Sequence, residues 1–548
     1  MNSSAVKKQG KGDSLIWFTG SAVTLTLLMT ITLVVVILVN GLGYFWPHRL
    51  SQAELKDGSF ILGVIQKHET VIEGSNTHER VNLKIGNRDL NGLDFKWFDK
   101  KEIVGWEEPE EGVVVERMEY GNFYGSYKGL RLVNMEATGA GWAQFKTALA
   151  LTRNMLKQQE EIEHQMSALN YQLEKLRIEK IKIEYQARKK KGPGAKPEGP
   201  AANRIAAIEF QRDTIRAAFE AQQVILMAFL AQLAENESVF HDIHGTEKVI
   251  PLKDIVRAYQ PNAMSLPAKL GHYLLKIKEL ILENPRESNT EGGLFPTIFG
   301  TIMMVILMSL FCMPMGIVAA VYLREYAKQG FTVRLVRIAV NNLAGVPSIV
   351  YGIFGLGFFI YGLGGALDDA FFPHLAELHQ PKMKTGGILW ASVTLALLTV
   401  PVVIVATEEA LSSIPRGMRE GSLAMGATKW QTIRKVLLPM ASPGILTGLI
   451  LSMARAAGEV APLMITGVVK LAPSLPVDGQ FPFIHLDRKF MHLGFHIYDV
   501  GFQSPNVEAA MPMVYVTTML LLLIVLLLNI TAIRVRNKMR KQYTMGAF

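Results

Sequence analysis

The chain has 548 residues, of which 49% are hydrophobic and 19% are charged, and its formal net charge is +9. This composition is too apolar for a typical soluble protein and too charged for a chain that lies wholly in a membrane, so we expect both kinds of region. The single cysteine, Cys312, excludes an internal disulfide and a cysteine-based metal site. The basic balance requires no nucleic acid partner, because cytoplasmic loops of membrane proteins are enriched in Lys and Arg.

The first apolar run covers residues 15–39 and follows a polar, lysine-containing start. At about 1.5 Å per residue it is long enough to cross a hydrocarbon core of about 30 Å. A cleaved signal peptide is the alternative, but the run exceeds the usual length of such a segment and lacks a clear small-x-small cleavage site. We therefore expect a cytoplasmic N-terminus over residues 1–14 and an uncleaved transmembrane helix over residues 15–40.

Residues 46–288 contain no further span and are expected to form one water-exposed insert, placed in the periplasm by the cytoplasmic N-terminus. Its first part, residues 50–140, alternates apolar and polar residues in short runs separated by Gly, Asn and Pro, which predicts a sheet-rich region. Its last part, residues 237–288, is mixed and ends in an amphipathic helix at about residues 266–285.

The middle of the insert, residues 143–236, predicts a long helical hairpin. The stretch KKKGPGAKPEGP in its centre cannot continue a helix. We expect two antiparallel arms, the longer of about 40 residues and therefore about 60 Å long. Two interpretations stay open: the hairpin docks a partner subunit or binding protein, or it is a spacer that packs on its own sheet. The coiled-coil spacing that predicts the arms is carried by Ile162, Met166, Leu169, Leu173, Leu176 and Ile183, and by Ile205, Ile208, Ile215, Phe219, Leu226, Phe229 and Leu233.

The second half of the chain, residues 289–535, predicts five more transmembrane helices. Six spans place both termini in the cytoplasm, which agrees with the basic residues that follow the second span and fill the tail, residues 536–548. We therefore predict a polytopic α-helical membrane protein of six transmembrane helices with a large α+β periplasmic insert. The five apolar runs lie at residues 294–323, about 338–363, 388–407, about 442–469 and 511–533.

Residues 408–439 form a polar, basic segment between the fourth and fifth spans, on the cytoplasmic side. Its part EGSLAMGATKWQTIRKVLLP, from Glu420 to Pro439, predicts two short helices on either side of a turn at residues 426–428. An apolar stripe on an exposed cytoplasmic segment needs a partner to cover it. The second helix carries such a stripe, made of Trp430, Ile433, Val436 and Leu437.

Arg455 and Glu459 are charged residues in the fifth span, within LSMARAAGEVAPLM, and their spacing predicts that they share one helical face. An arginine at mid-membrane costs about 2.5 to 3.5 kcal/mol on insertion scales, so it faces a partner charge or a water-filled path. Either the two side chains neutralise each other, or Glu459 positions Arg455 to receive an anion, whose oxygens fit the guanidinium fork. Small residues around the pair permit the close approach of a second subunit.

No catalytic constellation stands out in the sequence. The 12 His residues are scattered, and neither HExxH nor GxSxG occurs in a suitable context. A Walker A motif is missing as well, so transport driven by ATP requires an ATPase in another chain. We expect a non-enzymatic protein that binds no metal or cofactor of its own.

The stretch from Glu420 to Pro439 resembles the coupling loop of bacterial ABC importer permeases. The loop of this family begins with a triplet of one acidic and two small residues, here Glu420, Gly421 and Ser422, which has Gly and Ser where Ala is usual. Val436 stands where isoleucine is usual. The resemblance implies that this loop inserts into a groove on a separate ATPase subunit. The matching residues are an acidic-small-small triplet, a glycine, and a branched residue two positions before Leu-Pro: Glu420, Gly421, Ser422, Gly426, Val436, Leu438 and Pro439.

The membrane half also resembles the phosphate importer permeases of the PstA type. The stretches that carry this are NTEGGLFPTIFGT from Asn289, PMGIVAAVYLREY from Pro314, AGVPSIVYGIFGL from Ala344 and ARAAGEVAPLMITG from Ala454. The resemblance implies a type I ABC importer permease of the bacterial inner membrane that moves phosphate past Arg455 and Glu459. It also implies the partners: a PstC-type permease, a dimer of ATP-binding subunits that uses ATP and Mg²⁺, and a periplasmic phosphate-binding protein.

The long insert departs from the short outer loop that is usual in this family, so its function does not follow from the resemblance. Two alternatives to phosphate import stay open. One is a permease for another oxyanion, such as sulfate or molybdate. The other is a membrane-anchored phosphate-sensing scaffold whose working part is the hairpin.

Overall fold

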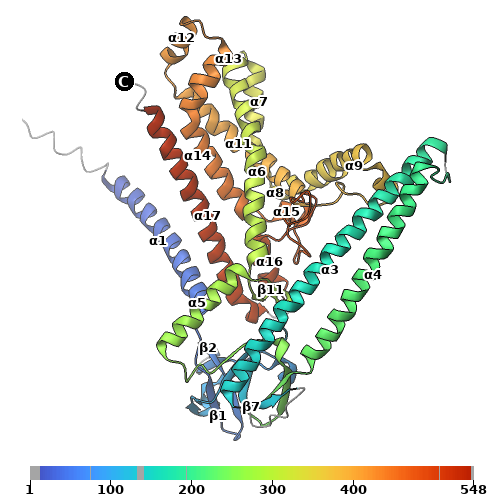
Figure 1. Ribbon diagram of the computed structural model, residues 1–548. Helices are drawn as coiled ribbons and strands as arrows, with labels where there is room; N and C mark the ends of the chain where they lie inside the picture. The colour runs from blue at the N-terminus through green and yellow to red at the C-terminus, as the bar shows by residue number, and fades with distance from the viewer. Residues whose placement is uncertain (1–12, 74–75, 133–140, 193, 505–506, 545–548) are drawn as a thin grey trace, which may run out of the picture. The chain divides into compact units, whose positions relative to one another are not determined.

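The computed structural model describes residues 13–73, 76–132, 141–192, 194–504 and 507–544. Most of the predicted cytoplasmic N-terminus and the end of the predicted tail, residues 1–12 and 545–548, lie outside the described residues. The chain forms two compact units, which are called the bundle unit and the insert unit below (Figure 1). The bundle unit comprises Met1–Trp46, Leu294–Gly355 and Gly387–Phe548, and the insert unit comprises Pro47–Gly293 and Leu356–Gly386.

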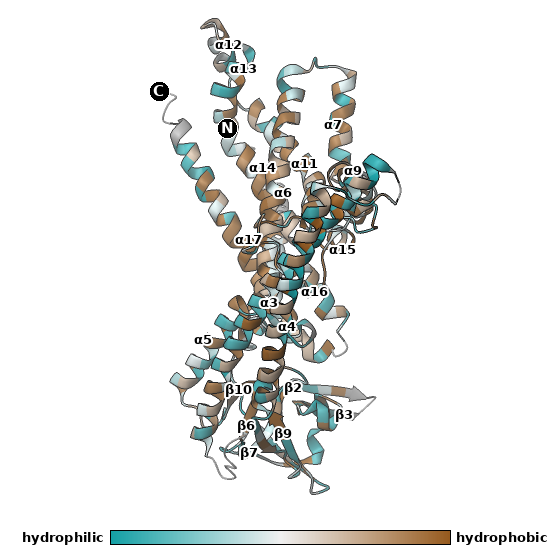
Figure 2. Cartoon of the chain, turned by 45° about the vertical axis from the view of Figure 1, so that its right-hand side comes forward, coloured by the Kyte–Doolittle hydropathy of each residue, from teal (hydrophilic) through white to brown (hydrophobic). Residues whose placement is uncertain are grey.

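The bundle unit is built from helices, most of which are hydrophobic along their length (Figure 2). Short π-helical segments, Tyr322–Tyr326 and Ile433–Leu437, extend α6 and join α13 to α14. In chain order the helices are α1 Asp13–Gly43, α6 Phe295–Val321, α7 Phe331–Leu343, α8 Ser348–Phe354, α11 Ile388–Ser412, α12 Arg416–Ala424, α13 Lys429–Thr432, α14 Leu438–Gly458, α15 Ala461–Thr466, α16 Leu493–Phe502 and α17 Val507–Thr544.

Helix α11 packs closely against both α6 and α14, and small residues make this possible. A Cβ added at Gly316 of α6 would lie 2.5 Å from Val403 Cγ1, and one added at Gly448 of α14 would lie 2.6 Å from Ala406 Cβ. Both neighbours belong to α11, so the three backbones approach one another as helices in membranes do at small residues. The buried core of the bundle includes Met304, Met308, Cys312, Leu395 and Ala456.

Within the described residues, seven helical stretches are long and apolar enough to cross a membrane by length and composition. Six of them correspond to the six predicted spans. The seventh is one arm of the hairpin, and its first 21 residues carry six charged side chains. The seven stretches are Trp17–Gly43, Pro200–Ala234, Phe295–Tyr326, Ser348–Phe371, Ile388–Ser412, Lys429–Gly458 and Val507–Lys541.

The third span begins later than predicted. The sequence predicts a start at about residue 338, but α7 ends at Leu343 and the spanning helix begins at Ser348. Pro347 lies directly before the first residue of α8, where its missing N–H costs no helical hydrogen bond, and it disfavours a helical backbone at the residue before it, so a break is favoured here. Apolar residues lie on both sides of the proline, which is why hydropathy alone did not reveal the break.

The insert unit contains two antiparallel five-stranded sheets, with the strand orders β4-β3-β2-β1-β5 and β10-β6-β7-β8-β9. The predicted sheet region, residues 50–140, supplies seven of these strands. The other three follow the hairpin, where the sequence predicts only a mixed region. Of these, β8 pairs with β7, β10 pairs with β6, and β9 pairs with β8. The bounds are β1 Ser51–Leu55, β2 Phe60–Glu73, β3 Asn76–Lys84, β4 Phe95–Asp99, β5 Ile103–Glu107, β6 Val113–Arg117, β7 Phe123–Arg131, β8 Glu237–His241, β9 Glu247–Pro251 and β10 Ile255–Tyr259.

The helical hairpin is inserted between β7 and β8. Its first arm, α3 Trp142–Lys191, has 50 residues and is about 75 Å long, which exceeds the predicted length. Its second arm is α4 Pro200–Ala234. Ion pairs join the arms: Lys180 Nζ lies 2.7 Å from Glu209 Oε1, and Arg204 Nη2 lies 2.8 Å from Glu179 Oε1.

Near its distal end, α3 contacts another segment of the insert unit. Arg188 Nη2 lies 3.2 Å from Glu377 Oε2, and the rings of Tyr185 and His374 are 6.5 Å apart. These partners lie in or next to α10 Pro373–Ala376, which follows α9 Gly365–Phe371. The hairpin therefore packs on its own chain at its distal end. Docking of a partner by the hairpin stays a hypothesis.

Helix α5, Leu266–Leu282, packs on β6 and β10 through charged side chains. Lys276 Nζ donates to Glu116 Oε2 at 2.6 Å, and Arg257 Nη2 donates to Glu279 Oε2 at 3.1 Å. Burial alone would raise the pKa of Glu116, but the charges of Lys276 and Arg257 outweigh it and lower that pKa to about 2. The carboxylate therefore stays ionised at neutral pH although it is buried.

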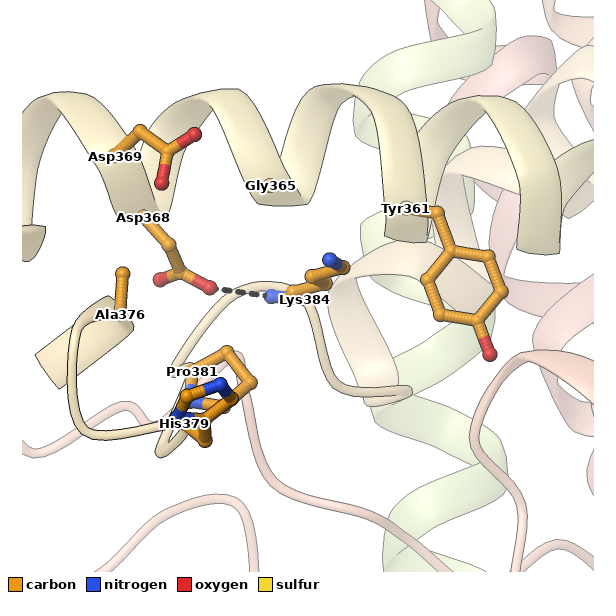
Figure 3. Close-up of a pocket in the computed structure, with 8 residues that line it drawn as sticks. All are labelled: Tyr361, Gly365, Asp368, Asp369, Ala376, His379, Pro381 and Lys384. Carbon is orange, nitrogen blue, oxygen red and sulfur yellow. Dashed lines mark hydrogen bonds between the residues drawn. The ribbon is translucent and has the colours of Figure 1, made fainter.

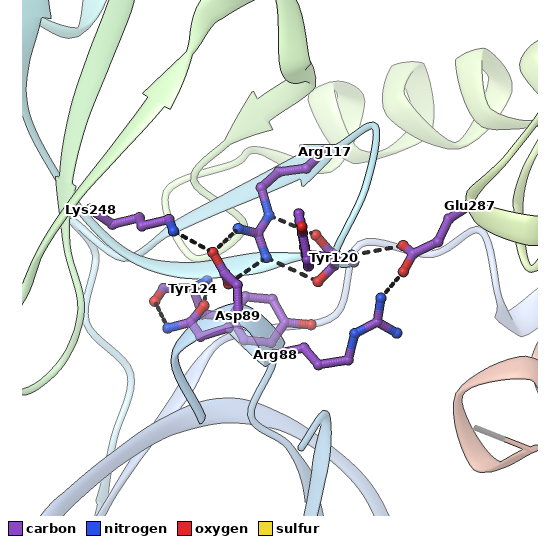
Figure 4. A network of polar contacts seen from close by, with 9 residues as sticks. Arg88, Asp89, Arg117, Tyr120, Tyr124, Lys248 and Glu287 are labelled. Atoms are coloured by element: carbon purple, nitrogen blue, oxygen red, sulfur yellow. Dashed lines mark hydrogen bonds and ion pairs between the residues drawn. The ribbon is translucent and has the colours of Figure 1, made fainter. Parts of the chain in front are cut away.

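A second ion network holds the short helix α2, Arg88–Asn91, against the second sheet (Figure 4). The buried Arg117 donates to both carboxylate oxygens of Asp89, at 2.9 and 3.1 Å. Lys248 Nζ lies 2.6 Å from the same carboxylate, and Arg88 pairs with Glu287. Because Glu287 lies between α5 and α6 in sequence, this network also fixes the end of the insert.

His272 of α5 is buried in the first of these charged layers. Its ring centre lies 4.4 Å from that of Tyr259. Burial lowers the pKa of His272 to about 4. The neighbouring carboxylates raise this pKa and the neighbouring cations lower it. Those charged groups are Glu116, Arg257, Lys276 and Glu279.

We predict that α5 becomes less stable between pH 6.5 and 4. In this window the unfolded chain, whose histidine pKa is about 6.5, binds a proton that the folded His272 does not bind. The contribution of the neutral His272 to the stability of α5 is therefore fully present above the pKa of the unfolded chain. It is lost as the pH falls toward the pKa of the folded state. Hydrogen-exchange protection of α5 in the full chain, corrected for intrinsic exchange, should fall by on the order of 2 kcal/mol. His272→Gln should remove most of this fall, and pH-independent protection of the unmodified chain would contradict the prediction.

Candidate functional site

The 420–439 loop forms two short helices around a tight turn, as predicted. Gly426 in this turn has a φ of 84°, a left-handed conformation that glycine adopts without strain. Thr428 caps α13, because its hydroxyl accepts a hydrogen bond from the N–H of Gln431 at 3.2 Å. The Gln431 side chain in turn accepts from the N–H of Thr428 at 2.8 Å, which completes a capping box.

The apolar stripe predicted on this loop is covered in part by the chain itself. Ile433 and Leu437 are buried in a cluster with Leu411 and Ile414, and Val436 packs at its edge. The cause is that the π-helical segment continues directly into α14, so this part of the stripe faces the bundle. The apolar surface that stays exposed lies at the tip of the loop and consists of Met418, Leu423, Met425 and Trp430.

The residues that match the family pattern are distributed along the same loop. Glu420 and Gly421 are exposed on α12, and Gly426 is exposed in the turn. Ser422 Oγ lies 2.9 Å from Thr432 Oγ1, and this hydrogen bond ties α12 to α13. The remaining three are half-buried where the π-helical segment passes into α14: Val436, Leu438 and Pro439.

Two contacts that the sequence did not predict attach the loop to the end of α6. Arg419 of α12 lies 3.2 Å from Glu325 Oε1 and donates to the carbonyl of Ile414 at 2.9 Å. Lys429 Nζ lies 4.9 Å from the ring centre of Tyr326, a cation–π distance. The available signal was Glu325 itself, an acid among the basic residues that follow the second span.

Arg455 and Glu459 lie at the end of a helix rather than within one. The helix runs from Lys429 to Gly458, whereas the sequence predicts a span over about 442–469. Glu459 is the residue at which the helix ends, with a φ of −78° and a ψ of 133°. The chain therefore leaves the helical path only after Glu459, and the side chains of Arg455 and Glu459 lie on the same side, as predicted. The helix ends here because of Pro462, whose ring would clash with the carbonyl four residues earlier in a regular helix.

The two side chains form an ion pair. Arg455 Nε lies 3.5 Å from Glu459 Oε1, and the side chains are 34% and 21% exposed. This separation is longer than the two hydrogen bonds of a bidentate guanidinium–carboxylate pair. Within the described residues it is the one ion pair of Arg455.

The break after α14 brings two of the sequence motifs together. Helix α15, within GEVAPLMITG, packs against α8, within AGVPSIVYG. A Cβ added at Gly352 of α8 would lie 2.8 Å from Pro462 Cα, and one added at Gly355, directly after α8, would lie 3.1 Å from Thr466 Cγ2 of α15. Glycine at these two positions therefore allows this approach.

A cavity of about 370 Å³ lies beside α9 in the insert unit (Figure 3). The buried carboxylate of Asp368 accepts hydrogen bonds from the backbone N–H groups of Lys382, Met383 and Lys384 at 2.7 to 3.2 Å. Asp368 thus holds the loop that follows α10, and we assign it a structural role. Within the described ranges, no group of three or more His, Cys, Asp or Glu side chains could hold a metal ion. The cavity is lined by Tyr361, Gly365, Asp368, Asp369, Ala376, His379, Pro381 and Lys384.

Comparison with known proteins identifies the family. The family described as "Binding-protein-dependent transport system inner membrane component" matches residues 312–541. "Probable phosphate transport system permease protein PstA" of Methanocaldococcus jannaschii is 31% identical over 279 residues, which cover 48% of this chain and 86% of that protein. "Phosphate transport system permease protein PstA" of Yersinia pestis is 33% identical over 249 residues, which cover 45% of this chain and 74% of that protein.

The chain belongs to the PstA-type permeases of ABC importers. It is therefore a multi-pass membrane component of a binding-protein-dependent importer. The permease is also 35% identical over 197 residues to "Probable ABC transporter permease protein YqgH" of Bacillus subtilis, a match that spans 36% of this chain and 59% of that protein. The sheets and the hairpin of this permease lie outside the residues that match the family, which begin at residue 312.

We predict that Arg419→Ala loosens the attachment of the 420–439 loop. The change removes the ion pair with Glu325 and the hydrogen bond to Ile414, which together should increase hydrogen exchange of the α12 amides about tenfold in the full chain. Arg416→Ala is the matched control, because Arg416 is exposed on the same helix. Equal exchange rates in the two variants would show that the Arg419 contacts do not hold the loop.

Proposed function

We propose that this permease imports phosphate as part of an ATP-driven importer of the inner membrane. The observation that carries the proposal is the similarity to proteins named phosphate transport system permease PstA, which are 31% to 37% identical to the chain. In this proposal the chain pairs with a PstC-type permease and receives phosphate from a periplasmic binding protein. Both termini lie in the cytoplasm, the insert lies in the periplasm, and two ATP-binding subunits hydrolyse ATP with Mg²⁺.

Arg455 is the proposed contact for phosphate in the translocation path. A guanidinium presents a planar fork of N–H donors that matches two phosphate oxygens. The contact of Glu459 is with Nε, and in this proposal the terminal nitrogens face the anion. The carboxylate also offsets part of the positive charge, which keeps the site from holding phosphate so tightly that it cannot leave.

The 420–439 loop is the proposed contact for the ATPase. The exposed tip residues Met425 and Trp430 supply the apolar surface that a groove on the ATPase would cover. The residues assigned to this coupling role are Glu420, Gly421, Ser422, Gly426, Val436, Leu438 and Pro439.

One helix would transmit the movement from the loop to the phosphate contact. The stretch Lys429–Gly458 is continuous over 30 residues, or about 45 Å, and it ends three residues after Arg455. A helix of this kind moves as a rigid element when one of its ends is displaced. Closure of the ATPase on the loop would therefore change the position of Arg455.

ATP-dependent uptake of labelled phosphate into vesicles that contain the complete complex tests the function. We expect unlabelled phosphate to compete with the label, and sulfate and molybdate not to compete. Competition by sulfate or molybdate would instead indicate a permease for another oxyanion. Absence of any phosphate flux in the intact, assembled complex would favour the scaffold function.

In the same assay we predict that Arg455→Ala lowers uptake by at least about tenfold, because a charged hydrogen-bond pair contributes about 1.5 to 3 kcal/mol. Arg455→Lys keeps the charge but lacks the fork, so it should restore only a small part of the uptake. Arg334→Ala, at an exposed arginine of α7, is the control. Normal uptake by both Arg455 variants, with assembly confirmed by co-purification of the ATPase, would remove Arg455 from the path.

A further inference from the structure

Helix α5 buries polar side chains and exposes apolar ones, whereas a helix on the surface of a soluble domain does the reverse. Its inner face, toward β6 and β10, carries charged and polar side chains, of which Glu279 is 3% exposed and His272 is 7% exposed. These side chains are satisfied by the charged layer described above, with Lys276 bonded to Glu116. The insert thus holds α5 by ion pairs and leaves its apolar face uncovered.

The outer face of α5 is almost entirely aliphatic. The exposed leucines and isoleucine recur at the three- and four-residue spacing that places them on one side of the helix. Lys278 is the one charged side chain on this exposed face. A continuous aliphatic stripe of this kind requires a cover. It consists of Leu266, Leu270, Leu274, Leu275, Ile281 and Leu282, which are 41% to 70% exposed.

The chain keeps α5 close to the start of a membrane span. Twelve residues separate the end of α5 at Leu282 from the start of α6 at Phe295. These residues fold back on themselves as the strand pair β11 Pro285–Arg286 and β12 Glu291–Gly292, and the N–H of Gly293 donates to the carbonyl of Asn284 at 3.0 Å. The path along the chain from the end of α5 to the span is thereby shortened to about 10 to 15 Å.

We propose that α5 lies in the surface of the lipid bilayer, with its aliphatic face among the lipid chains, on the side of the membrane where the insert lies. The short tether brings the helix to the level at which α6 enters the membrane. Leucines suit the boundary between acyl chains and headgroups, and the stem of Lys278 can lie along them while its ammonium group reaches a lipid phosphate. Protein-binding faces are enriched in Trp, Tyr and Arg, and the exposed positions of α5 carry none of them.

This interaction would attach the insert to the membrane independently of what the permease transports. The chain connects the ends of the insert to membrane spans, and these connections restrain its ends. A helix α5 that lies in the bilayer surface would add one more point at which the insert is attached to the membrane. Because ion pairs bind the charged inner face of α5 to the sheets, the helix stays attached although its leucines face outward. The insert would then keep a fixed height above the membrane, at the entrance that the periplasmic binding protein must reach.

A lipid-quenching experiment on the full-length permease in nanodiscs tests the proposal. The only native cysteine, Cys312, is buried, so an environment-sensitive fluorophore can be attached at Leu274→Cys, in the middle of the aliphatic face. Val104→Cys, at an exposed apolar residue of β5, is the matched control. We expect nitroxide-labelled lipids to quench the probe at position 274 at least about twofold more than at position 104, and aqueous iodide to show the opposite order.

Two outcomes would overturn the proposal. Quenching by iodide and not by lipid at position 274 would mean that the face is in water. Protection from both quenchers would mean that protein covers it, either the same chain or, if protection needs the complete complex, a partner subunit. As a second test, Leu270→Glu with Ile281→Glu should abolish lipid quenching at position 274 while α5 keeps its hydrogen-exchange protection, because both side chains are exposed. Unchanged lipid quenching in that double variant would also contradict the proposal.

Discussion

The helix of the fifth span ends at Gly458, where Pro462 disfavours its continuation, and the position of the chain beyond it depends on this break. Glu459 is the residue at which the helix ends, and its carboxylate lies 3.5 Å from Arg455 Nε. The short helix that follows the break is then placed against α8, where Gly352 allows the two backbones to approach. An uninterrupted helix would not give this contact with α8.

The same helix gives the permease a physical connection between its two proposed working parts. One end emerges from the 420–439 loop, which is attached to α6 by Arg419 and Lys429. The other end carries Arg455. Small residues along α6 and α14 allow close packing on α11, so movement of the helix would involve its neighbours rather than occur alone. The large insert is not part of this connection, and its α5 is held to the sheets mainly by charged side chains, with Leu280 as the one buried aliphatic residue of the helix.

How much the sequence could predict depends on whether the signal was local. The turn at Gly426, the two arms of the hairpin and the apolar runs are local patterns, and the structure contains them all. Strands β8 and β10 pair with strands more than 100 residues away, so only a mixed region could be predicted there. The Arg419–Glu325 pair joins residues 94 apart, and its only local signal was an acid among the basic residues that follow the second span. For α5 the periodicity predicted an amphipathic helix, but not that its polar face would be the buried one.

The most direct measurement of the central claim, that phosphate passes Arg455, uses a cysteine placed beside it. Gly458 is exposed, and a Cβ added there would have no neighbouring atom within 4 Å, so Gly458→Cys should be accommodated. Because the only native cysteine is buried, a small charged thiol reagent would report on the new one. Its rate of modification in the complete complex would be measured with phosphate, with sulfate and without either anion. We predict that phosphate slows modification several-fold and that sulfate does not. Equal rates under all three conditions would contradict the claim.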